Sequence, residues 1–189
     1  MNPRAHDPCP SPLFARRSLA LAGLLLFLVP LAACKDGESP SGPSLPSAVE
    51  ISLSSSNAPE LFSVVVDLAR VQAIDANGNP HSLGDAGLIE LLALEDAPTG
   101  ILQAPLANGS YQSLELGFDL PDSTVTVIAG GPPVPLLFSP ADVSVPVEFS
   151  VTEGATARVR LDIDLDGLIQ AADGTWILEP RFGVVGTVR

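Results

Sequence analysis

Four aspartates near the end of the chain have a spacing that is typical of calcium-binding loops. Asp162, Asp164 and Asp166 alternate with other residues and are followed by Gly167, and Asp173 lies eleven residues after Asp162. This order fits an EF-hand loop, with aspartate in place of the final glutamate. Calcium prefers hard oxygen ligands, and alternating carboxylates around a glycine turn can supply them. Asp162, Asp164, Asp166 and Asp173 are therefore candidate calcium ligands.

The same segment also has the pattern of a half-buried β-strand. Val159, Leu161 and Ile163 alternate with charged residues, as in a strand with one face in water. Such a strand would spread the aspartates over about 13 Å, which is too far for them to converge on one ion. A third arrangement is a strand through Asp164 followed by an ion-binding loop from 166 to 173. We favour the plain strand and keep calcium as the alternative.

The remaining candidate residues show no catalytic arrangement. His81 lies near Ser82 and Asp85, but no motif in the sequence places a base beside a nucleophile. The sequence contains no zinc motif, phosphate-binding loop or dinucleotide fingerprint. The stretch 75–79 (DANGN) is typical of a hairpin turn. We expect Trp176, the single tryptophan, to anchor the core, with carbohydrate stacking as the alternative, and we expect no enzymatic activity.

The N-terminal segment has the layout of a secretory signal peptide. Arg16 and Arg17 precede the apolar stretch 19–29, and small residues follow at 32 and 33. The apolar stretch extended to position 33 has 15 residues, fewer than the roughly 20 that a spanning helix needs. Leu31-Ala32-Ala33-Cys34 resembles the lipobox of bacterial lipoproteins. We therefore expect cleavage after residue 33 and lipidation of Cys34.

The lipobox resemblance implies a diacylglycerol on the Cys34 thiol and a further acyl chain, such as palmitate, on the new amino group. Several acyl chains together give a stable membrane anchor. Lys35 follows the cysteine, where retention at the inner membrane usually needs aspartate, so the sequence favours the outer membrane.

Charge and cysteine content narrow the range of partners. The formal net charge is −13, and removal of the first 33 residues, which carry three arginines and one aspartate, would leave −15. An acidic surface repels phosphate backbones, so we expect no nucleic-acid partner. The two cysteines are Cys9, in the expected leader, and Cys34, so the mature domain is expected to contain no disulfide.

The mature part of the sequence is rich in β-strand signals. The stretch 35–47 is rich in serine, proline and glycine and is expected to be a flexible tether. From Ala48 onward, short apolar stretches are separated by turn residues, which indicates an all-β fold, an antiparallel β-sandwich of immunoglobulin-like or prealbumin-like type. The stretch 88–94 is ambiguous between strand and helix, and 95–103 is expected to hold a short helical turn. Expected strands lie at 49–53, 62–74, 111–118, 123–128, 134–138, 143–151, 157–165 and 175–188. The domains are expected at 1–33 (leader), 34–47 (lipidated cysteine and tether) and 48–189 (β-sandwich).

Four segments in order resemble a bacterial family known as domain of unknown function 4382. They are Val64–Val71 (VVVDLARV), Leu106–Tyr111 (LANGSY), Val159–Asp164 (VRLDID) and Trp176–Pro180 (WILEP). The resemblance covers most of 48–188 and implies a β-sandwich on exported, often lipidated proteins, with no known activity. Within it, Gly109 is expected to allow a turn and Tyr111 to bury its ring while its hydroxyl bonds to backbone, as in a tyrosine corner.

These observations predict a non-catalytic, membrane-anchored lipoprotein of the cell envelope with a structural, adhesion or assembly role. The alternative is a module that binds calcium or carbohydrate. The membrane would be reached through the lipid on Cys34, and the sequence does not identify the protein or glycan partner.

Overall fold

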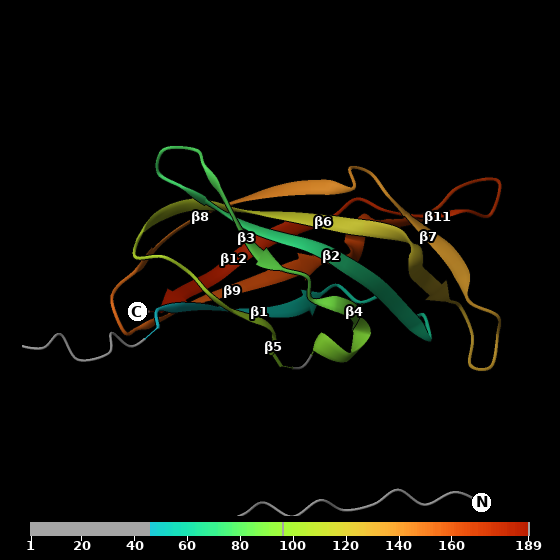
Figure 1. Ribbon diagram of the computed structural model, residues 1–189. Helices are drawn as coiled ribbons and strands as arrows, with labels where there is room; N and C mark the ends of the chain where they lie inside the picture. Colours follow the sequence, from blue (N-terminus) through green and yellow to red (C-terminus); the bar gives the residue numbers. More distant parts are fainter. Residues whose placement is uncertain (1–45, 96, 189) are drawn as a thin grey trace, which may run out of the picture. The chain divides into compact units, whose positions relative to one another are not determined.

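The computed structural model of the protein describes residues 46–95 and 97–188 (Figure 1). The expected leader, Cys34 and most of the expected tether lie outside these residues. The described part contains twelve β-strands, two short 3₁₀ turns and no α-helix. The strands are β1 (Ala48–Ser56), β2 (Ser63–Asp75), β3 (Pro80–Gly84), β4 (Gly87–Glu90), β5 (Thr99–Pro105), β6 (Gly109–Thr126), β7 (Val134–Phe138), β8 (Asp142–Val151), β9 (Thr156–Asp164), β10 (Leu168–Gln170), β11 (Trp176–Leu178) and β12 (Arg181–Val188), and the turns are η1 (Leu92–Leu94) and η2 (Leu165–Gly167).

The strands form two sheets that pack face to face, which confirms the predicted all-β sandwich. The smaller sheet has the order β12-β9-β1-β5. The larger sheet has the order β10-β11-β7-β6-β2-β3, with β4 also paired to β2 and β8 to β6. Most pairs are antiparallel, but β1 runs parallel to β9 and β7 runs parallel to β11. The first strand of the domain thus lies beside a strand from its last third.

Alternating apolar residues explain why these segments form strands that bury one face. In β1, Val49, Ile51 and Leu53 are buried while their neighbours are partly exposed. β9 shows the same alternation, and each inward side chain contributes about 1.5–3 kcal/mol on burial. The ring of Phe118 on β6 stacks on that of Phe138 on β7 of the same sheet, with centroids 4.7 Å apart. It also stacks at 6.3 Å on Phe182 of β12, and this contact joins the two sheets.

The segment between β4 and β5 differs from the sequence prediction. The ambiguous stretch 88–94 divides into the end of β4 and the turn η1. The helical turn expected within 95–103 is wrong, because Thr99–Pro105 forms strand β5. β5 pairs with β1 from Ala48 to Leu53, so a partner distant in sequence determines its conformation.

The longest strands, β2 and β6, form the centre of the larger sheet. They pair from Ser63 with Thr126 to Asp75 with Tyr111. β6 then uses its other edge twice, pairing with β8 over its first half and with β7 near its end. The two halves of the larger sheet therefore share the same pair of strands.

The β2–β6 ladder is interrupted where Asp67 faces Asp119, and Ser123 fills the interruption. Ser123 is fully buried. Its hydroxyl donates to the Asp119 carbonyl at 2.7 Å and accepts the Asp67 amide N–H at 2.9 Å. The side chain therefore satisfies two backbone groups that the irregular pairing leaves without a strand partner.

Replacing Ser123 should destabilise the domain. Ser123→Ala leaves the Asp67 N–H without its acceptor, and we expect the free energy of unfolding to fall by about 1–3 kcal/mol in denaturant titrations. Ser144→Ala, at an exposed position of β8, is the matched control and should stay within about 0.5 kcal/mol of wild type. Equal effects of the two substitutions would contradict the role given to Ser123.

Candidate functional site

The four candidate calcium ligands lie on three different elements. Asp162 and Asp164 project from the outward face of β9, as the plain-strand interpretation requires. Asp166 lies in η2, and Asp173 lies in the loop between β10 and β11. The loop from 166 to 173 considered from the sequence is instead divided by the strand β10.

Neighbouring side chains donate hydrogen bonds to both carboxylates on β9. Ser54 Oγ donates to Asp162 Oδ1 at 2.8 Å, and Ser56 Oγ donates to Asp162 Oδ2 at 2.5 Å. Asp164 Oδ1 accepts Asn57 Nδ2 at 2.9 Å and the Asp166 N–H at 3.0 Å. These bonds, that from Asn57 first, hold the pKa of Asp164 below its ordinary value. The parallel register of β1 and β9 produces this arrangement, because it places Ser54 opposite Asp162 and Ser56 opposite Asp164.

Gly167 has a packing role in this segment. A Cβ atom at Gly167 would collide with the carbonyl oxygen of Glu179, so no residue with a side chain fits at this position. The two backbones approach closely because the Glu179 N–H donates to the Gly167 carbonyl at 3.0 Å. The glycine that completes the calcium-loop pattern is thus required by contact with a neighbouring segment.

Asp173 caps its own loop, where Asp173 Oδ1 accepts the Thr175 N–H at 3.0 Å. This bond is the main cause of the lowered pKa of Asp173. Within residues 46–95 and 97–188, no three His, Cys, Asp or Glu side chains are grouped so that they could hold a metal ion. The calcium site stays a prediction.

The segment 75–79 forms the predicted hairpin turn between β2 and β3. Asp75 Oδ1 accepts the backbone N–H groups of Asn77 and Asn79, both at 2.8 Å, and Gly78 has φ +85°. The hydrogen bonds, led by the one from the Asn79 side chain, lower the pKa of Asp75 far below its ordinary value. His81 Nε2 lies 3.3 Å from Asp75 Oδ2, and its ring meets Tyr111 edge-on at 5.5 Å. His81 thus helps to hold the hairpin against the body of the sandwich.

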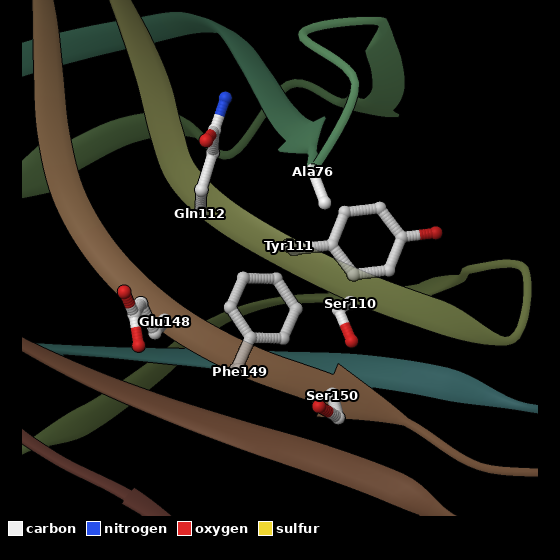
Figure 2. A pocket seen from close by; sticks show the side chains of 7 residues that line it. All are labelled: Ala76, Ser110, Tyr111, Gln112, Glu148, Phe149 and Ser150. Carbon is white, nitrogen blue, oxygen red and sulfur yellow. The ribbon is translucent and has the colours of Figure 1, made fainter.

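A hollow of about 380 Å³ lies beside Tyr111 and Phe149 (Figure 2). The two rings come from neighbouring strands and stack with centroids 5.1 Å apart. Both residues are buried, so their rings offer no open face to a sugar. Tyr111 Oη donates to the Ala107 carbonyl at 2.8 Å, which confirms the predicted bond from hydroxyl to backbone. The rim of the hollow is polar and consists of Ser110, Gln112, Glu148 and Ser150.

A cluster of four aspartates on the larger sheet was not expected from the sequence. Asp67 on β2 pairs directly with Asp119 on β6. Burial and the negative charges of Asp119, Asp122 and Asp85, in that order, raise the pKa of Asp67. We name Asp67, Asp85, Asp119 and Asp122 the acidic cluster. No local motif could reveal it, because Asp67, Asp85 and the neighbouring pair Asp119 and Asp122 come from three separate segments of the chain, which the folding of the sheet brings near one another.

A row of apolar side chains crosses three strands of the same sheet. Leu137 on β7 pairs with Ile177 on β11, which pairs with Ile169 on β10. Leu137 is 39% exposed, Ile169 is 49% exposed, and Ile177 is partly exposed. We name these three residues the apolar row. Trp176, next to Ile177, packs partly buried against the core, as predicted for a core anchor.

Comparisons with protein families, curated proteins and solved structures find no match for this chain. The resemblance to the domain of unknown function 4382 family stays a prediction. In the described part of the chain, no helix is long and apolar enough to cross a membrane.

We expect the Tyr111 hydroxyl to stabilise the folded domain. Tyr111→Phe removes the bond to the Ala107 carbonyl and keeps the ring stack, so we expect a loss of about 0.5–1.5 kcal/mol in the free energy of unfolding. Denaturant titration measures this loss, and Gln112→Ala at the exposed rim serves as the control. A Tyr111→Phe domain as stable as wild type would argue against a tyrosine corner.

Neutralising Asp67 should stabilise the domain at neutral pH. Its raised pKa means that the ionised carboxylate is less favourable in the folded protein than in the unfolded chain. Asp67→Asn should therefore raise the melting temperature at pH 7. The gain should shrink as the pH falls through the raised pKa of the folded protein, and it should vanish below the ordinary value of 3.8, where the wild-type carboxyl is protonated in both states.

Asp173→Asn is the control of opposite sign for this pH series. Its lowered pKa means that ionisation stabilises the folded state, so the substitution should lower the melting temperature at pH 7. Melting curves of both variants across the acid range check the two signs. A melting temperature of Asp67→Asn below that of wild type at pH 7 would contradict the repulsion within the acidic cluster.

Proposed function

We propose that this chain is a non-catalytic lipoprotein of the bacterial cell envelope, anchored through Cys34, whose β-sandwich serves structure, adhesion or assembly. The leader 1–33 would be removed, and the lipid would hold the domain at a membrane, with the outer membrane favoured by Lys35. The lipobox and the tether support the anchor. The exposed apolar side chains at the end of the sandwich opposite the tether support the binding role.

The proposal rests on the position at which the expected tether joins the domain. Ser47, its last residue, donates through Oγ to Asn108 Oδ1 at 2.6 Å, and that Oγ accepts the Gly154 N–H at 3.3 Å. The Ser47 carbonyl accepts the Leu106 N–H at 3.1 Å. The chain therefore enters the sandwich at the end formed by the β5–β6 and β8–β9 loops. We name this the tether end.

The opposite end carries most of the exposed large apolar side chains. β1 leads away from Ser47 for nine residues, roughly 30 Å at 3.3 Å per residue. In Figure 1 the start of β1 lies at the left, and β7 and β11 lie toward the right. The exposed apolar residues of this far half are Phe62, Leu120, Val127, Ile128, Leu137 and Ile169.

An anchor at the tether end would turn these residues away from the membrane, where they could meet a partner. Clustered exposed apolar side chains mark interaction sites in soluble domains. The contacts of His81 with Asp75 and Tyr111 give the single histidine outside the expected leader a structural role, in keeping with a protein that binds rather than catalyses.

Substituting the lipidated cysteine should release the protein from membranes. We expect Cys34→Ser to abolish palmitate labelling and to move the chain out of the detergent-extractable membrane fraction, unless the uncleaved leader retains it. Mass spectrometry of the N-terminus separates these two cases.

The second cysteine provides the matched control. Cys9→Ser, in the expected leader, should leave lipidation and fractionation as in wild type. A wild-type protein with an unmodified thiol at Cys34 and the leader still attached would overturn the proposed anchor.

A further inference from the structure

We propose that the acidic cluster and the apolar row form one docking surface for a protein segment that combines basic and apolar side chains. This inference rests on the proposed binding role and names the chemistry of the partner. It does not depend on lipidation. The surface lies on the outward face of the larger sheet.

The apolar row interrupts the pattern expected of a sheet face in water. In β7 and β11, Leu136 and Leu178 already point into the core and are fully buried. Leu137 and Ile177, next to them, point to the other face, so these strands are apolar on both sides. A sheet face in contact with water normally presents polar residues. Apolar side chains aligned in register over three strands indicate a surface that is covered when a partner binds.

The acidic cluster borders this row by strand geometry. Thr124 on β6 pairs with Pro135 on β7. Asp122 lies two residues before Thr124 on β6, and Leu137 lies two residues after Pro135 on β7, so both leave the same end of this antiparallel pairing. On the other flank, Asp67 pairs with Leu88 of β4, which is 62% exposed. Apolar side chains therefore border the carboxylates on two sides.

The charge of the cluster has no internal partner among the described residues. The ion pairs there are Arg70–Asp142, Arg158–Glu50, Arg181–Glu179 and His81–Asp75, and none includes a member of the cluster. Burial first, and then the negative charges of its neighbours in the cluster, raise the pKa of Asp67. A bound cationic side chain would relieve the repulsion between these charges, and the apolar flanks favour a peptide or protein over a hydrated metal ion.

A synthetic peptide can test the surface. The probe is a peptide of about 12 alternating lysine and leucine residues, long enough to lie across several strands. Its controls alternate glutamate with leucine and lysine with serine. Binding to the purified full-length chain is measured by fluorescence anisotropy at low and at physiological ionic strength, about 0.15 M. We expect the lysine–leucine peptide to bind at least about tenfold more tightly than either control, and more weakly at the higher salt.

Variants locate the site on the chain. The double substitution Asp119→Asn with Asp122→Asn, and separately Leu137→Ser with Ile169→Ser, should each weaken binding by about tenfold or more. Glu148→Gln with Glu153→Gln, exposed near the tether end, is the charge-matched control. Val185→Ser, at a position 60% exposed on the smaller sheet, is the apolar control. Both controls should bind as wild type does, and circular dichroism confirms that each variant is folded.

Three results would overturn the proposal. They are no binding of the lysine–leucine peptide, equal binding of the lysine–serine peptide, and an equal loss of affinity in the control variants. Either of the last two results would mean attraction to net charge alone. The same titrations on Cys34→Ser distinguish this inference from the anchor. Unchanged affinity in that variant supports a surface independent of lipid, whatever the fractionation experiment shows.

Discussion

The pairing of β2 with β6 is the constraint on which the larger sheet depends. The inward side chains of these two strands pack into the core. The other edge of β6 pairs with β8 along its first half and with β7 near its end. Their register also sets the surface chemistry, because it pairs Asp67 with Asp119. At the same point, the buried Ser123 hydroxyl bonds to the backbone of both Asp67 and Asp119. Core packing and the acidic cluster therefore share one structural origin.

The parallel pair of β1 and β9 gives the domain its second organising feature. β1 begins directly after Ser47, which is hydrogen-bonded to Asn108, and β9 starts at the same end beside it. The direction of the first strand thus separates a tether end from a far end rich in exposed apolar side chains. In a lipid-anchored protein this polarity would determine which residues a partner can reach. Burial and the neighbouring carboxylates raise the pKa of Asp67, so its ionised side chain has a cost in stability at neutral pH.

Local pattern predicted some elements well and others poorly. Alternating residues in β1, β2 and β9 indicated strands, and Asp75 and Gly78 marked the hairpin turn that the structure contains. The bond from Tyr111 to the Ala107 carbonyl also followed from local sequence, since only four residues separate the two. β5 was missed because its backbone conformation comes from pairing with β1, which its own sequence does not encode.

The sequence by itself determined the all-β class and the turn chemistry, because side-chain alternation and positive-φ glycines act over a few residues. Around Cys34 it also has the pattern from which we predict a leader and a lipobox. Only the tertiary structure decided that Asp162 bonds to Ser54 and Ser56, that Gly167 contacts Glu179, and that Asp67 meets Asp119. These contacts join residues far apart in the chain. Strand order and register, which follow from packing of the whole core, bring them together.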